Sequence, residues 1–124
     1  MGNKKVLKER RKHKRFKVKE GAFAVATPDY NRLGQIKDIS QGGLAFQFNE
    51  DGEQTKDPFK VEIFSTIDDF YINKIPVRTI LDFELEKTVS SNQTPKRQLS
   101  MKFGKLNYPQ RLLLRFFIQK YTCN

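Results

Sequence analysis

The sequence predicts a mainly β protein, a six-stranded antiparallel β-barrel with one α-helix at its C-terminal end. Three observations support this fold class. Apolar and polar residues alternate along most of the 124-residue chain, short polar segments divide that alternation into runs, and helical spacing of apolar residues appears only near the C-terminus. Alternation with a period of two indicates strands with one buried face, and the length is that of one domain. A barrel buries those faces together without leaving open edges.

The first two strands are predicted to form a hairpin. Residues 16–26 make the outgoing strand, with Gly21 as a bulge at which the alternation changes phase. The segment TPDYN (27–31) supplies the turn, and the chain returns along residues 32–40.

The remaining strands follow from the same pattern. Each set of apolar residues shares one parity and therefore one face. The sets are Leu44, Phe46 and Phe48; Phe59, Val61, Ile63 and Ile67; Tyr71, Ile75, Val77, Leu81, Phe83 and Leu85; and Leu99, Met101 and Phe103. Pro76 interrupts the third set and indicates an edge or a bulge, because proline has no N–H to donate to a neighbouring strand. Segments 49–57 and 90–96 are turn-like in composition.

The C-terminal stretch NYPQRLLLRFFIQKYT predicts one amphipathic helix, with Pro109 near its first turn. We expect Leu113, Phe116, Phe117 and Tyr121 to face the barrel. Arg111 and Arg115, four residues apart, are assigned to the exposed face.

Positive charge is concentrated at the N-terminus. Residues 1–20 hold ten Lys/Arg and two Glu, so this segment carries +8 of the net charge of +10. Like charges at this density repel one another and oppose packing. The sequence therefore predicts a flexible basic N-terminal arm, residues 1–15, followed by the barrel and its helix, residues 16–122. Such an arm is suited to an anionic ligand.

Several classes of protein are not expected. The chain has no run of about 18 apolar residues, so no membrane insertion is expected. The basic N-terminus has no apolar stretch behind it and is not a secretory signal. A single cysteine, Cys123, suits a reducing cytoplasm. No nucleophile–base pair, metal-ligand spacing or P-loop indicates an enzyme, and His13 has no neighbouring ligand that would make it a metal ligand.

Two short motifs are predicted to meet at one end of the barrel. RKHKR places Arg11 and Arg15 in an R-x-x-x-R arrangement just before the first strand, and DISQGG begins at Asp38 near the end of the second. Because the two strands form a hairpin, the end of the second returns to the start of the first.

The chemistry of these motifs favours a guanine nucleotide. Arginine presents a planar fork that matches phosphate oxygens or the O6/N7 edge of guanine. Asp38 can accept from the N–H groups of guanine, and Ser40 can donate to a phosphate or a base atom. Gly42 and Gly43 allow a close backbone approach, and we expect positive φ there.

The two motifs together resemble those of the PilZ domain family. Gly34-x-Ile36-x-Asp38 before the second motif, GGLAF after it and a late LSMKFGKL strand extend the similarity from about Arg10 to Tyr121. The resemblance implies a bacterial, cytoplasmic cyclic di-GMP receptor that has no further cofactor and is not an enzyme. The implied ligand-binding residues are Arg10, Arg11, Arg15, Asp38, Ser40, Gly42 and Gly43.

In this interpretation, the ligand orders the arm, and an unidentified effector protein recognises the change. Two alternatives stay open: a small nucleic-acid-binding barrel that uses the basic arm, and a ligand-free adaptor for another protein. For the receptor itself we expect only weak, electrostatic binding of nucleic acid.

Overall fold

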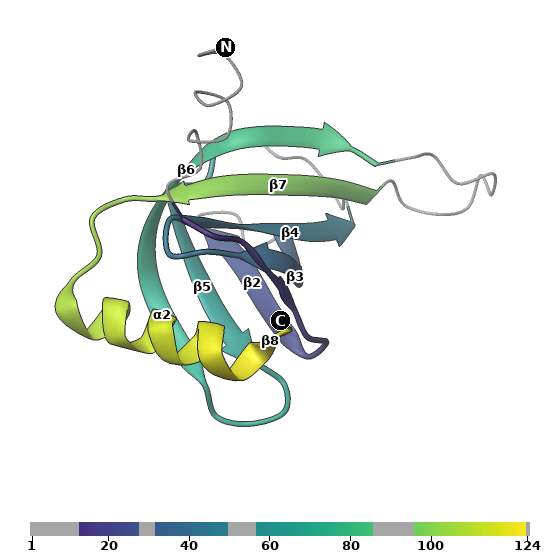
Figure 1. Cartoon of the computed structure of the whole chain (residues 1–124). Helices are drawn as coiled ribbons and strands as arrows, with labels where there is room; N and C mark the ends of the chain where they lie inside the picture. The colour runs from purple at the N-terminus through teal and green to yellow at the C-terminus, as the bar shows by residue number, and fades with distance from the viewer. Residues whose placement is uncertain (1–12, 28–31, 50–56, 86–95, 124) are drawn as a thin grey trace, which may run out of the picture.

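The computed structural model describes residues 13–27, 32–49, 57–85 and 96–123. Within them, six strands close a barrel in the order β2-β5-β6-β7-β4-β3, because β2 pairs with both β5 and β3 (Figure 1). All of these pairings are antiparallel. The elements are β1 (Phe16–Val18), β2 (Ala22–Thr27), β3 (Arg32–Ile39), β4 (Gly43–Asn49), β5 (Lys60–Ser65), β6 (Tyr71–Glu84), β7 (Lys96–Phe103), α2 (Tyr108–Tyr121) and β8 (Thr122–Cys123). The predicted fold class is confirmed.

The first predicted strand is divided in two at Gly21. Gly21 has φ of +98°, a left-handed conformation that favours glycine, and its carbonyl accepts a hydrogen bond from Thr66 N at 2.8 Å. Before this break, β1 pairs with β3 and β8; after it, β2 pairs with β3 and β5. The sequence predicted an irregularity at the correct residue. The irregularity separates two strands, β1 and β2, and is not a bulge within a single strand.

Small residues of β2 face the barrel interior. Ala22, Ala24 and Ala26 are fully buried, whereas Phe23 is only partly buried and stacks on Phe64 with ring centroids 5.8 Å apart. The large interior side chains come from the other strands, including Ile36, Phe46, Ile63 and Leu99. A narrow barrel is filled by combining small and large residues, so the alanines of β2 offset the large interior side chains of the other strands.

The long strand β6 contains irregularities that change which side chains face inward. At the first one, Lys74 has φ of +54°, and the pairing with β5 shifts register between Val61 and Ile63. A second register shift, in the pairing with β7, lies between Thr79 and Leu81. Pro76 itself stays paired with Lys60, so the first bulge precedes the proline.

These shifts overturn the single buried parity predicted for residues 71–85. Ile72, Ile75 and Val77 are buried, but Tyr71, Leu81 and Phe83 are exposed. An extra residue in one strand sends the following side chains to the opposite face, and the apolar pattern alone does not reveal it.

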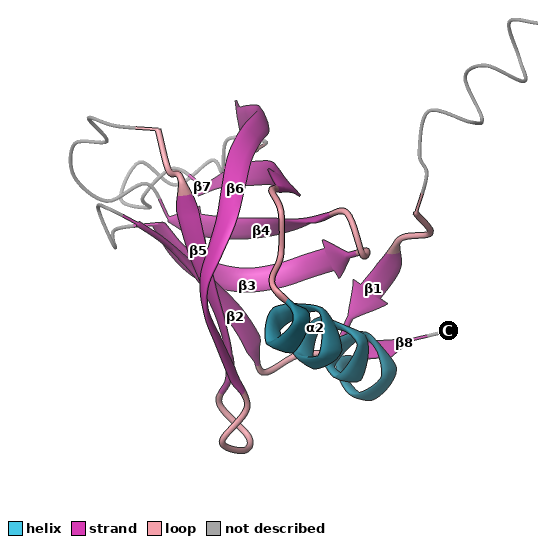
Figure 2. Ribbon diagram, turned by 90° about the vertical axis from the view of Figure 1, so that its left-hand side faces the viewer, coloured by secondary structure: helices cyan, strands magenta, loops and turns pink. Residues whose placement is uncertain are grey.

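Helix α2 begins with a capping box. Asn107 Oδ1 accepts from Gln110 N at 2.8 Å, Gln110 Oε1 accepts from Asn107 N at 3.0 Å, and Pro109 lies in the first turn. The helix lies outside the barrel strands, in contact with β6 and β8 (Figure 2).

The buried stripe of α2 differs from the predicted one. Phe117 and Tyr121 are buried as expected, but the third buried residue is Leu114, and Leu113 and Phe116 are exposed. A helix with several consecutive apolar residues can bury more than one of its faces. Packing against the barrel buries the face that carries residues 114, 117 and 121.

Asp68 links the turn between β5 and β6 to the end of α2. Its Oδ2 accepts hydrogen bonds from Lys120 Nζ at 2.8 Å and from the Tyr121 hydroxyl, and its Oδ1 accepts from Phe70 N at 3.0 Å. The Lys120 hydrogen bond, helped by those from Tyr121 and Phe70, holds the pKa of Asp68 far below its ordinary value. Desolvation, with the Asp68 contact, raises the pKa of Tyr121.

Asp68→Asn should therefore lower the melting temperature near pH 7, because the charged acceptor is lost. A carboxyl group whose pKa is lowered by folding stabilises the folded state fully above its unfolded pKa of about 4. This contribution is lost progressively as the pH falls from that value toward the lower pKa of the folded state. The difference in melting temperature between wild type and Asp68→Asn should thus shrink on acidification. Asp69→Asn, an exposed neighbour, is the matched control, and equal effects of the two variants would contradict the assignment.

Candidate functional site

The end of β3 and the start of β1 bring the two predicted motifs together. Lys17 of β1 lies opposite Asp38, and Phe16 lies opposite Ile39. Arg15 immediately precedes β1, and its Nη1 is 3.9 Å from Asp38 Oδ1. The convergence predicted from the hairpin is therefore confirmed for Arg15 and Asp38. Arg10 and Arg11 lie outside the described residues.

The Arg15–Asp38 pair is long and accessible. The Arg15 side chain is 42% exposed and that of Asp38 is 31% exposed. Exposed ion pairs of this kind contribute little to stability, roughly 0–1 kcal/mol. Both groups therefore keep most of their hydrogen-bonding capacity available for a ligand on the barrel surface.

Ser40 organises the turn that follows Asp38. Its hydroxyl oxygen accepts from Gly42 N at 3.0 Å, and its own backbone N–H donates to Gly43 O at 2.8 Å. The residue is 7% exposed. Ser40 thus stabilises the turn through its side chain and its backbone, a role that serine often has in turns.

Gly42 and Gly43 do not have the positive φ that we expected; among the described glycines only Gly21 does. The requirement for glycine is steric instead. A Cβ on Gly43 would lie 2.2 Å from Met101 O on the paired strand β7, and one on Gly42 would lie 2.8 Å from the His13 ring. The close neighbour of Gly43 is the paired strand β7, so this contact does not test the expected approach of a ligand to the turn.

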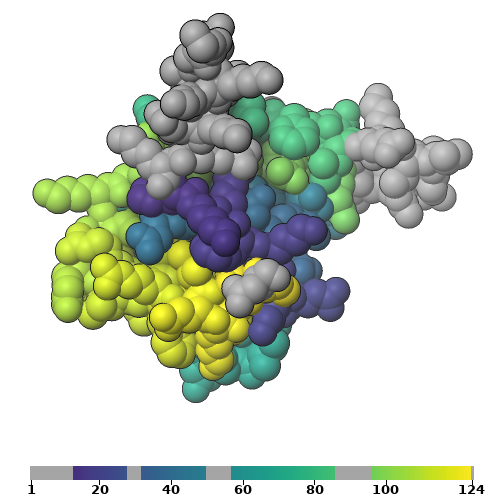
Figure 3. All heavy atoms as spheres, viewed as in Figure 1, coloured from purple at the N-terminus to yellow at the C-terminus, as the bar shows by residue number. Residues whose placement is uncertain are grey.

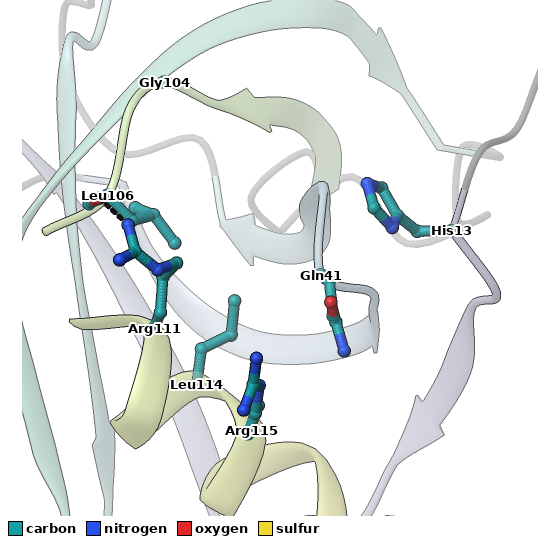
Figure 4. Close-up of a pocket in the computed structure, with 7 residues that line it drawn as sticks. All are labelled: His13, Gln41, Gly104, Leu106, Arg111, Leu114 and Arg115. Carbon is teal, nitrogen blue, oxygen red and sulfur yellow. Dashed lines mark hydrogen bonds between the residues drawn. The ribbon is translucent and has the colours of Figure 1, made fainter. Parts of the chain in front are cut away.

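A pocket that the sequence did not predict lies beside this turn. His13 and Gln41 line one side, and Arg111 and Arg115 of α2 line the other (Figure 4). The cavity has a volume of about 260 Å³. In Figure 3, the purple segment that starts the described chain lies on the surface next to the yellow helix. The two helix arginines are exposed, as predicted, but they face a cavity.

The four-residue spacing of Arg111 and Arg115 was the one feature of the sequence that could have indicated this pocket. It shows that Arg111 and Arg115 share one side of the helix. It does not show which part of the barrel that side faces, because this depends on how α2 packs.

The chain belongs to the PilZ domain family, whose model matches residues 9–118. The solved structures show the same fold. The PilZ domain with c-di-GMP of YcgR from Escherichia coli has a TM-score of 0.63 and 15% identity, covering 91% of this chain and 92% of that one. The K. pneumonia MrkH–c-di-GMP complex has a TM-score of 0.64 and 16% identity, covering 90% and 52%.

A longer YcgR structure in complex with c-di-GMP, also from Escherichia coli, has a TM-score of 0.60 and 17% identity, with 89% of this chain and 45% of that chain covered. The chain thus spans about half the length of the MrkH structures and of this longer YcgR structure. No curated protein gave a significant sequence match.

The described segments contain neither a metal-binding cluster nor a membrane-spanning helix. No group of three or more His, Cys, Asp or Glu side chains there is arranged to hold a metal ion. Among the same residues, no helix combines the length and apolar character needed to cross a membrane.

The steric role of Gly43 leads to a stability prediction. Gly43→Ala places a methyl group against the Met101 carbonyl of a paired strand, so β4 and β7 must separate locally. We expect a loss of about 1–3 kcal/mol in unfolding free energy, the usual cost of overpacking, measured by urea denaturation. Gly42→Ala meets only the His13 side chain, which can rotate, and should cost less. An unchanged Gly43→Ala midpoint would contradict this account.

Proposed function

We propose that this chain is a bacterial, cytoplasmic receptor that binds cyclic di-GMP at Arg15, Asp38 and the Ser40–Gly43 turn. The observation that carries the proposal is the Arg15–Asp38 pair, 3.9 Å apart and exposed, at the edge of a PilZ barrel. Membership of a family whose similar structures are c-di-GMP complexes supports the choice of ligand.

Each group has a distinct role in the proposed complex. The guanidinium of Arg15, with those of Arg10 and Arg11 from the arm, offers forks to guanine O6/N7 and to phosphate oxygens. Asp38 accepts from the N–H groups of guanine, a role that a general anion site would not require. At the turn, Gly42 is the glycine that the ligand can approach, because a Cβ there would meet only the His13 side chain, whereas Gly43 packs against Met101 of β7.

The ligand would exchange one weak contact for several stronger ones. In the described structure, Arg15 and Asp38 neutralise each other across 3.9 Å. A guanine base that displaces this contact satisfies both groups, and the phosphates draw the basic arm onto the barrel. Ordering the arm reduces the net affinity, so the charge-assisted hydrogen bonds must exceed that cost.

The strand that directly follows the arm, β1, is hydrogen-bonded to the C-terminal end of the described chain. β1, which follows Arg15, pairs with β8, and Lys19 N donates to Tyr121 O at 2.7 Å. Arm ordering therefore changes the surface beside α2, and we propose that an effector protein recognises this surface.

Isothermal titration calorimetry tests the proposal. Cyclic di-GMP should bind, and cyclic di-AMP, which lacks the guanine N–H pattern, should not. Arg15→Ala and Asp38→Ala should each weaken binding by about 1–3 kcal/mol, the range for a bidentate base contact, without lowering the melting temperature much. Lys96→Ala, which removes one charge at the far end of β7, is the control.

Equal affinity for the two dinucleotides would indicate a plain anion site. The competing nucleic-acid function would be favoured by tight, sequence-selective DNA or RNA binding that persists at physiological salt and is not displaced by cyclic di-GMP.

Amide hydrogen exchange tests the proposed switch. The arm, residues 1–15, should exchange rapidly without ligand and become protected when cyclic di-GMP is added, because ligand contacts are what order it. Barrel strands such as β4 should be protected in both states and provide the internal control. An arm already protected in the free protein would contradict the switch.

A further inference from the structure

The pocket beside the Ser40–Gly43 turn has a lining suited to an anion. Its charged or titratable side chains are Arg111, Arg115 and His13, and none of the residues that line it is acidic. Leu106 and Leu114 provide apolar surface beside these groups. Positive groups without a carboxylate, next to apolar surface, fit a phosphate attached to a larger organic group better than a cation or a neutral solute.

The two arginines differ in how they are held. Arg111 Nη1 donates to Leu106 O at 2.7 Å, and its guanidinium lies over the Tyr108 ring, 5.8 Å from the centroid. Arg115 makes no ion pair or hydrogen bond with any described residue, and its side chain lies at the edge of the pocket, near Gln41 (Figure 4). Arg115 is therefore the group with donors available for a ligand, while Arg111 is anchored as part of the wall.

The pocket adjoins the motif residues through two of its lining residues. His13 is two positions before Arg15, and Gln41 lies between Ser40 and Gly42. The Ser40–Gly43 turn also approaches the His13 ring closely at Gly42. The cavity and the Arg15–Asp38 pair thus lie near the same turn, so one dinucleotide can extend from one to the other.

We infer that Arg115 is an additional ligand-binding residue, which contacts a phosphate of the cyclic dinucleotide held by Arg15 and Asp38. The inference rests on the proposed function, since it extends the same site. The bound phosphate would join three segments that are distant in the sequence: the end of the arm, the turn after β3 and helix α2. Ligand binding would then act on the helix directly, as well as through the β1–β8 pairing.

The test compares Arg115→Ala, Arg115→Lys and Lys96→Ala with wild type by calorimetry with cyclic di-GMP at one fixed salt concentration. Arg115→Ala should weaken binding about tenfold, the scale of one charge-assisted contact. Arg115→Lys should recover part of the loss, because an ammonium keeps the charge but not the planar fork. Lys96→Ala, which removes the same charge far from the pocket, should bind nearly as wild type does.

The outcomes separate this inference from the proposed function. If wild type binds cyclic di-GMP and Arg115→Ala binds as tightly as Lys96→Ala, the inference is wrong and the proposed function stands. A similar weakening by both variants would indicate a general charge effect and would also overturn it. If wild type does not bind cyclic di-GMP, the proposed function fails, and this inference fails with it.

Discussion

The site depends on the way β3 divides its pairing between two strands. Along its first half, β3 pairs with β2 and closes the barrel; at its end, Asp38 and Ile39 pair with β1. The change of partner is possible because the chain breaks at Gly21, whose positive φ ends one strand and redirects the next. The break also shifts the register: Phe23 lies opposite Gln35 but Lys17 lies opposite Asp38, so six residues of the first segment span only three of β3 and the start of β1 is drawn toward Asp38. A backbone constraint at one glycine therefore positions a pair of charged groups elsewhere.

A second irregularity determines which way Asp38 faces. The pairing of β3 with β4 shifts register between Ile36 and Asp38, and both Ile36 and Ile39 are fully buried while Asp38 is partly exposed. A regular strand would place residues 36 and 38 on the same face. The bulge thus keeps two isoleucines in the core and turns the intervening carboxylate outward. The same irregularity determines both the packing of the two isoleucines and the direction of Asp38. Substitutions in this part of β3 would therefore affect both.

Regular features of the structure could be predicted from the sequence, and irregular ones could not. Alternation, turn composition and the N-terminal charge predicted the barrel, the hairpin and the meeting of Arg15 with Asp38. The bulges of β6, the inward face of the β2 alanines and the buried stripe of α2 depend on tertiary packing, which a periodic pattern does not encode. The pocket at Arg115 was missed for the same reason: its two walls are 74 residues apart in the chain, and only the packing of α2 brings Gln41 and Arg115 together.

Two carboxylates, Asp68 and Asp38, differ in how many of their hydrogen-bonding positions the fold occupies. Asp68 accepts from Lys120 at 2.8 Å, from the Tyr121 hydroxyl and from a backbone N–H, and it fixes a turn to the helix. Among the described residues, Asp38 forms one ion pair, with Arg15 at 3.9 Å, and both side chains contact solvent. A carboxylate that stabilises the fold benefits when all its hydrogen-bonding positions are occupied by protein donors. A carboxylate that binds a ligand must keep some of those positions available. The weak pair at the barrel edge is thus consistent with a ligand site, because displacing it loses little and leaves both groups able to bind the ligand.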